Sequence, residues 1–369
     1  MKLYICSTIV FLFLFLSCND DKNKTKNYAL LDIESSITIG NTNNFSLNKI
    51  VKEINVIPTE TNDSTLLKHM FIAGVIGNEI IFYDKEALYS VNRTNGKVNT
   101  ILRKQGSGPE EYKYIIDVII DNDSIVYIYD SGKRGFLKFN INGTFNQFIK
   151  NDSIGTFQKI KDDYSVVCYS PFINSNNFVS IYDEKGNYYR NSIHNNRKDI
   201  ELDMYYWNRL NKYNDLILFK DFLGDTIYNI TAQADLPYIV LNKGKYKIPI
   251  EIASNRDKVD KEGHKYVQQE SFYISSHYCF FTYYFDRNKY YDIWDMNTSR
   301  LLYRNILIYQ SRDIRIGTPV KINNQDINVW ANFAINNYIY CIVEAEDAIK
   351  LIPSLPEDSN PILLEIKLE

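Results

Sequence analysis

The sequence lacks the residue patterns of the common metal and nucleophile sites. Its four histidines show no metal-ligand spacing, and neither Cys-x-x-Cys, His-Glu-x-x-His nor Gly-x-Ser-x-Gly occurs. Lysine and arginine number 42 against 45 aspartates and glutamates, so this near balance gives no electrostatic case for binding nucleic acid. No local motif assigns a reaction, and we therefore predict no catalytic residue, no metal site and no cofactor.

Cysteine is also scarce, with five residues in the chain. After Cys18 only Cys168, Cys279 and Cys341 follow, and each lies in an apolar, strand-like run. An odd number without paired spacing argues against a disulfide framework, even in an exported chain. We expect these three cysteines to be buried free thiols.

Long apolar runs are absent except for Leu3–Leu16, which is too short to cross a bilayer as a helix. Lys2 precedes this run and Ser17 follows it, which is the pattern of a secretory signal. Cys18 stands where a lipobox places the lipidated cysteine. We predict a lipoprotein signal peptide over residues 1–17 and a lipid anchor at Cys18; the alternative is an ordinary secretory signal with a chance cysteine.

The residues after Cys18 are polar and lack core-forming side chains as far as Asn27. Such a composition favours a flexible tether, which we place at residues 18–30. The acyl chains on a lipidated Cys18 would then hold the chain to a membrane without any further membrane segment.

The chain is rich in residues that favour β-strands. It contains 30 Tyr and 20 Phe but only 15 Gly, and it has no long stretch rich in Ala, Leu and Glu. The 352 residues after the signal exceed what one compact core usually holds, so either two domains or a repeat architecture is expected.

A repeat is visible as an apolar strand, a short polar turn, a strand that ends in an aromatic-x-Asn or aromatic-Asp pattern, and a further strand. The turn residues are spaced 48, 43, 46 and 66 residues apart: Asn92, Asn140, Asp183, Asn229 and Asp295. Periods near 40–50 residues with several short strands are typical of propeller blades. We predict an all-β, six-bladed β-propeller over residues 31–369.

A propeller is a ring and has to close. Asn48–Ile57 has strand character without a partner of its own, and we predict that it pairs with Pro361–Leu368 so that both ends of the chain complete the last blade. Residues 249–263 form a charged insertion that is able to form a short helix between two blades. This insertion would be either a lid over the channel mouth or a solvated excursion.

The loop from Arg103 to Tyr112 joins two repeat units and contains two glycines and a proline. Propeller ligands commonly enter where such loops lie, so we list as candidate ligand-binding residues Arg103, Lys104, Glu110, Glu111, Tyr112 and Asp117. In the structural alternative, the loop holds two blades together through Gly106, Gly108 and Pro109, and Glu111 accepts hydrogen bonds from backbone donors. Asp84, Asp130 and Asp286 follow strands and are expected to stabilise turns rather than to bind Ca²⁺.

The Gly106–Tyr112 loop, Asp225–Ile230 and Glu357–Leu364 together resemble the six-bladed β-propeller lipoproteins of Bacteroidota, which are NHL- and TolB-like and mostly lack an established activity. We expect a monomer held by its lipid in the outer membrane, facing either the cell surface or the periplasm. The export signal, the repeat and the absence of local catalytic motifs favour a non-catalytic module that binds a glycan, a peptide or a protein. The alternative is an NHL-type lyase, lactonase or hydrolase with Ca²⁺ or Zn²⁺ in its channel.

Overall fold

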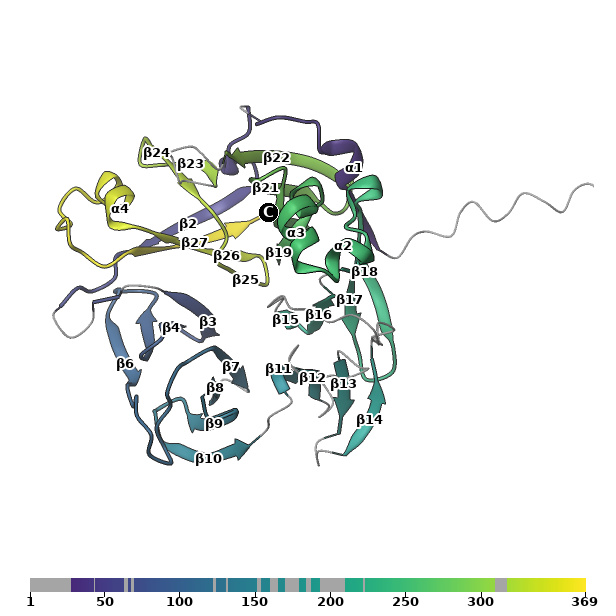
Figure 1. Ribbon diagram of the computed structural model, residues 1–369. Helices are drawn as coiled ribbons and strands as arrows, with labels where there is room; N and C mark the ends of the chain where they lie inside the picture. Colours follow the sequence, from purple (N-terminus) through teal and green to yellow (C-terminus); the bar gives the residue numbers. More distant parts are fainter. Residues whose placement is uncertain are drawn as a thin grey trace, which may run out of the picture.

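The computed structural model describes residues 28–369 except for 43, 63–65, 68–69, 122–123, 131, 151–153, 160–164, 170–178, 184–186, 193–209, 222 and 309–316. The described chain consists mainly of β-strands in separate antiparallel sheets that stand around a common centre (Figure 1). This is a propeller arrangement, and the predicted all-β class is confirmed. Cys18 and the predicted signal peptide lie outside the described residues.

The first three sheets are four-stranded meanders. Their strands are β3 (Phe71–Ile76), β4 (Glu79–Tyr83), β5 (Leu88–Asn92) and β6 (Val98–Leu102); β7 (Asp117–Asp121), β8 (Ile125–Asp130), β9 (Gly135–Asn140) and β10 (Phe145–Lys150); and β11 (Ile154–Lys159), β12 (Ser165–Tyr169), β13 (Val179–Tyr182) and β14 (Tyr188–Asn191). In each sheet the strand that comes first in the chain lies innermost (Figure 1).

The next two sheets continue the ring. They contain β15 (Leu210–Tyr213), β16 (Leu216–Lys220), β17 (Thr226–Ile230) and β18 (Asp235–Asn242), and then β19 (Gln268–Ser275), β20 (Tyr278–Phe285), β21 (Asn288–Asp295) and β22 (Arg300–Leu307). A two-stranded ribbon follows, made of β23 (Thr318–Ile322) and β24 (Gln325–Val329).

The remaining sheet joins the two ends of the chain. It contains β25 (Phe333–Ile335), β26 (Tyr338–Val343), β27 (Ile362–Leu368) and β2 (Val51–Ile57). β2 pairs antiparallel with β27 from Val51 opposite Leu368 to Ile57 opposite Leu363. The predicted pairing of these two segments is confirmed.

Five of the sheets have the regular four strands, so the predicted count of six regular blades is not confirmed. The sheet of β15–β18 differs because β1 (Ala29–Asp32) adds to the outer edge of β18 as a fifth, parallel strand. An unpaired outer edge presents free backbone N–H and C=O groups, and β1 satisfies those of β18. β1 begins at Ala29, so its first two residues belong to the fold rather than to a tether that ends at residue 30.

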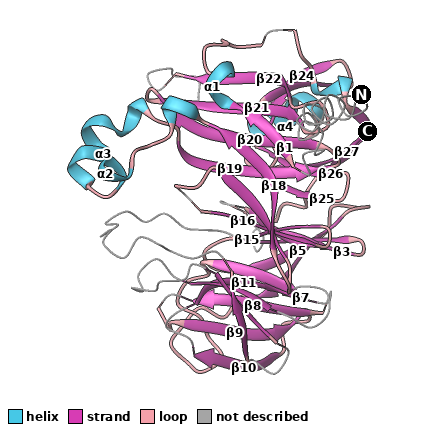
Figure 2. Cartoon of the chain, turned by 90° about the vertical axis from the view of Figure 1, so that its right-hand side faces the viewer, coloured by secondary structure: helices cyan, strands magenta, loops and turns pink. Residues whose placement is uncertain are grey.

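Helices are few and short. They are α1 (Ile33–Ser36), α2 (Ile250–Ala253), α3 (Arg256–Glu262) and α4 (Ala345–Leu351), with 3₁₀ turns η1 (Leu47–Lys49), η2 (Gly244–Tyr246) and η3 (Gly263–Lys265). α2 and α3 form the predicted insertion and stand out from the sheets (Figure 2). Within the described residues, no helix has both the length and the apolar character needed to cross a membrane.

The core consists of apolar layers between neighbouring sheets. Residues of β20 and β21 pack with β26 and β27 in one cluster, and residues of β4 and β5 pack with β26 and β27 in another. Cys279 and Cys341 are fully buried free thiols, as predicted, and burial raises the pKa of each thiol. The side chain of Cys168 lies outside the described part of the structure.

A buried ion pair fastens the N-terminal segment to the ring. Arg304 on β22 donates to both carboxylate oxygens of Asp292 on β21, at 2.8 and 2.6 Å, and both side chains are fully buried. The same guanidinium donates to the backbone oxygen of Ser36 in α1 and to the hydroxyl of Tyr283. The segment that leads from β1 to β2 is therefore held against β22.

Replacing Asp292 by alanine should lower the free energy of unfolding by about 3–5 kcal/mol, because Arg304 would remain buried without its counter-charge. Urea unfolding followed by tyrosine and tryptophan fluorescence measures this loss. Asp326→Ala, at an exposed position of β24, is the matched control and should change stability by less than about 0.5 kcal/mol. Equal effects of the two variants would contradict the role of the ion pair.

Candidate functional site

The loop between β6 and β7 is closed by its own backbone. The amide of Gly106 donates to the carbonyl of Tyr112 at 2.9 Å, and the amide of Tyr112 donates to the carbonyl of Lys104 at 3.1 Å. Lys133 on the neighbouring turn donates to the carbonyl of Gly108. The loop is thus a compact joint between two sheets.

Glu111 points back into this loop. Its Oε2 accepts a bond from the amide of Gly108 at 2.7 Å. A Cβ atom at Gly106 would lie 2.0 Å from the same oxygen, so this carboxylate position requires glycine at residue 106. Glu111 therefore accepts a backbone donor, as the structural alternative predicts.

Tyr112 is fully buried beneath the loop. Its hydroxyl donates to the carbonyl of Glu86 and accepts from the amide of Lys104 at 3.1 Å. Burial raises the pKa of Tyr112 to about 12. The side chain ties the loop to the preceding sheet and is not open to a ligand.

The charged residues of the loop are paired with one another or with the sheet. Arg103 donates to the hydroxyl of Tyr89 at 2.8 Å, and its guanidinium lies over the ring of that tyrosine. Lys104 and Glu110 form an exposed ion pair at 3.3 Å. Arg103 is thus held against the preceding sheet, and Lys104 and Glu110 are paired at the surface.

The aspartates that follow strands hold turns. Asp84 accepts from the amides of Glu86 and Ala87, each at 2.7 Å, and Asp130 accepts from the amide of Gly132 at 2.8 Å. Asp286 occupies a turn position with a positive φ of 47°. Turn stabilisation is thus confirmed for Asp84 and Asp130. Across the described ranges, no three His, Cys, Asp or Glu side chains are grouped so that they could hold a metal ion.

A cavity lies at the centre of the ring. Its volume is about 690 Å³, and its wall is built from the inner strands β3, β7, β11, β15, β19 and β25, with residues from the β24–β25 region and from the start of α4. Inner strands contact one another, as β3 does with β7 and β25, and β11 with β7 and β15. Every sheet of the ring thus contributes to one site.

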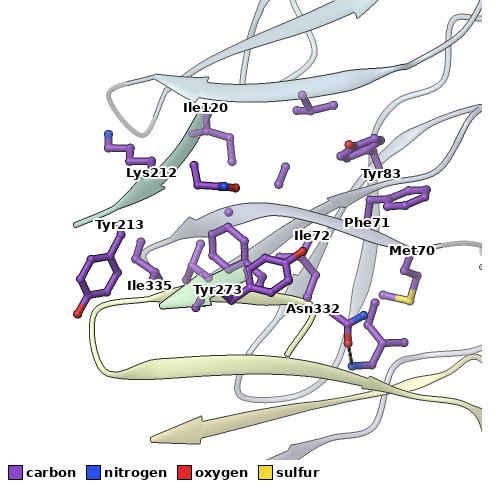
Figure 3. Close-up of a pocket in the computed structure, with 18 of the residues that line it drawn as sticks. Met70, Phe71, Ile72, Tyr83, Ile120, Lys212, Tyr213, Tyr273, Asn332 and Ile335 are labelled. Carbon is purple, nitrogen blue, oxygen red and sulfur yellow. Dashed lines mark hydrogen bonds between the residues drawn. The ribbon is translucent and has the colours of Figure 1, made fainter. Parts of the chain in front are cut away.

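Aromatic rings mark one end and the middle of this cavity. Phe71 at the start of β3 is 50% exposed, and its ring stacks on Tyr83 with centroids 5.5 Å apart. Tyr273 lies in the middle of the wall, and Tyr213 lies at the end opposite Phe71 (Figure 3). Trp330 also lines the cavity, and the ammonium group of Lys289 lies 4.8 Å from its ring centroid.

Polar groups are spread over the same wall. Asp117 on β7, Asn211 and Lys212 on β15, and Asn328 on β24 line the cavity. Asn332 is fixed in place because its Oδ1 accepts the amide of Ile342 at 2.8 Å (Figure 3). The cavity can therefore offer hydrogen bonds along its length together with flat apolar faces.

Of the candidate ligand-binding residues, Asp117 is the one that lines the central cavity. Asp121, at the other end of β7, forms an ion pair with Lys159 at 2.6 Å. Phe71, Asn211 and Tyr273 were missed because a strand pattern does not show which strand lies innermost. What these three residues share is that each lies on the first strand of its meander, β3, β15 or β19.

Removing the Tyr112 hydroxyl should destabilise the protein. Tyr112→Phe leaves the Glu86 carbonyl and the Lys104 amide without this partner, so we expect a loss of about 1–3 kcal/mol in the free energy of unfolding. Urea titration measures the loss. Tyr114→Phe changes a 56% exposed ring in the same loop and should have almost no effect. A stable Tyr112→Phe protein would contradict the structural role of the loop.

Comparison with known proteins gives a family and a fold. The model of a family described as a domain of unknown function (DUF4934) matches residues 29–367. The solved structure of a candidate exported protein from Bacteroides fragilis superposes with a TM-score of 0.70 at 16% identity, covering 92% of this chain and 99% of that one. The solved structure of a DUF4221 family member from Bacteroides vulgatus superposes with a TM-score of 0.49 at 11% identity, covering 87% of this chain and 97% of that one. None of the curated proteins compared with the chain matches it.

Proposed function

The chain belongs to the family described as a domain of unknown function (DUF4934), and we propose that this member is a non-catalytic binding propeller that takes its ligand into the central cavity. The observation that carries the proposal is the cavity itself. Its volume of about 690 Å³ falls within the range of ordinary ligand sites, and its wall combines apolar faces with a few polar groups.

The arrangement of the wall supports binding rather than a packed interior. Phe71 leaves half of its surface exposed at the cavity end, although the same ring is held by stacking on Tyr83. A ring that is fixed but open offers contact area at a low cost in conformational entropy. A glycan, a peptide or a loop of a protein partner would be able to use it.

We further propose that the ring has six blades and that the protein acts as a monomer. The five-stranded sheet supports this count, because β15–β18 follow the same meander order as the four-stranded sheets and β1 only extends their outer edge. Six sheets then surround the cavity. A crystal structure that contained fewer or more sheets would overturn the count.

The proposed location is the outer membrane, with the propeller at the cell surface and lipid on Cys18. The support is the order of Lys2, the apolar run and Ser17-Cys18 at the start of the sequence. Because lipidation requires the cysteine thiol, Cys18→Ala should move the protein from the membrane fraction to the soluble fraction of cells. Cys6→Ala is the matched control and should leave the protein in the membrane fraction. A Cys18→Ala protein that stays there would contradict the anchor.

Thermal unfolding of the full chain with panels of glycans, peptides and divalent metals tests the binding proposal. A ligand at one hundred times its dissociation constant adds about 2.7 kcal/mol to native stability and raises the unfolding midpoint. Asn211→Trp places a large ring into the cavity and should abolish the shift.

Asn99→Trp is the matched control for this experiment because Asn99 is exposed on the outer strand β6. It should keep the ligand-induced shift. A ligand whose shift survives Asn211→Trp binds elsewhere and overturns the cavity as the site. A shift produced by metal alone, together with turnover of a substrate, would instead favour the propeller enzymes of the lyase or lactonase type.

A further inference from the structure

The charges around the central cavity nearly balance and do not favour an anionic ligand. The Asp, Glu, Lys and Arg side chains of the cavity wall, as far as the structure describes it, are Asp117, Lys212, Glu344 and Asp347. The ammonium group of Lys289 lies against Trp330 of the same wall, so three carboxylates stand with two ammonium groups. Lys212 lies at the end of the cavity away from Phe71 (Figure 3). The wall therefore offers no excess of positive charge to a phosphate, sulfate or uronate group.

The same carboxylates are not arranged as a strong site for a cation. Asp347 is paired with Lys350 at 2.6 Å, and Asp117 accepts the amide of Val118 at 3.0 Å. Glu344 is exposed to solvent, which screens its charge. These groups are better suited to accept hydrogen bonds from neutral hydroxyl groups than to balance several positive charges.

The aromatic rings supply flat faces of the kind that a sugar ring covers. The face of an aromatic ring carries negative charge, and the C–H groups on one side of a pyranose carry a small positive charge. Phe71 offers such a face, since its ring is half exposed and is held by Tyr83. Trp330 is a second ring at the wall, positioned by the contact of Lys289 with its indole.

Side-chain amides complete this chemistry. An amide carries both donors and an acceptor, and so it matches a hydroxyl group, which also donates and accepts. Asn211, Asn328 and Asn332 place amides on three separate parts of the wall, and Asn332 is fixed by its bond to Ile342. A wall that combines aromatic rings with amides is complementary to a polar but uncharged ligand that has apolar faces.

We propose that the ligand of the central cavity is a neutral oligosaccharide, which stacks on Phe71 and is held by the amides and carboxylates of the wall. This inference rests on the proposed binding function and narrows it to one class of ligand. The cavity volume of about 690 Å³ leaves room for several sugar rings.

The test is isothermal titration calorimetry on the purified full-length chain. The probes are neutral hexasaccharides (maltohexaose, xylohexaose, mannohexaose and chitohexaose), hexagalacturonate as an anionic oligosaccharide of equal length, and a lysine-rich hexapeptide. We expect at least one neutral hexasaccharide to bind and hexagalacturonate not to bind. Phe71→Ala should weaken the neutral sugar at least about tenfold, and Phe71→Tyr should retain most of the affinity.

Phe148→Ala is the matched control, since Phe148 is an exposed phenylalanine on the outer strand β10. It should leave the affinity unchanged, and the midpoint of thermal unfolding shows that each variant is folded. Binding of the hexapeptide or of hexagalacturonate alone, lost in Phe71→Ala, would overturn the sugar inference but leave the proposed binding function standing. If no probe binds, or if Phe71→Ala does not weaken sugar binding, the cavity is not a sugar site.

Discussion

Closure of the ring is the constraint on which the other features of this protein depend. The inner strands surround one cavity only if the last sheet is complete, and that sheet needs β2 from the N-terminal part and β27 from the C-terminus. A polar contact joins it to the first blade, because Glu365 on β27 accepts from Arg93 at 2.6 Å and from Tyr340 at 3.0 Å. Burial and the charge of Glu365 together raise the pKa of Tyr340. The two chain ends therefore act as one structural unit.

Buried charges reinforce the ring at places where apolar packing alone would not fix the partners. Arg304 and Asp292 hold the N-terminal segment, and Glu270 on β19 bridges Lys220 at 2.5 Å and Lys243 at 2.8 Å from the neighbouring sheet. A buried pair of this kind contributes little net stability compared with apolar residues, but it strongly disfavours any arrangement that separates the partners. We interpret the contacts of Glu270 as setting which sheets become neighbours, and the Arg304–Asp292 pair as fixing the position of the N-terminal segment.

The loop between β6 and β7 has a structural role, whereas the central cavity is the proposed binding site. In the loop, Glu111 and Tyr112 use their polar atoms on nearby backbone, so the loop is a rigid joint. In the cavity, Phe71 and Asn211 present surface without closing the space. A rigid ring around an open centre gives a preformed site, which lowers the entropy cost of holding a ligand.

The sequence by itself determined the strand-rich class, the repeat, the pairing of 48–57 with 361–368 and the burial of Cys279 and Cys341, because composition, turn spacing, apolar runs and the unpartnered strand at each end of a ring that has to close can be read from the chain. It also indicated the turn roles of Asp84 and Asp130, which involve neighbouring residues. Only the tertiary structure decided that β1 extends an edge, that Glu111 and Tyr112 face the joint, and that Phe71, Asn211 and Tyr273 meet at one wall. These outcomes depend on contacts between residues far apart in the chain, and the alternation of a single strand does not specify which neighbour each face will meet.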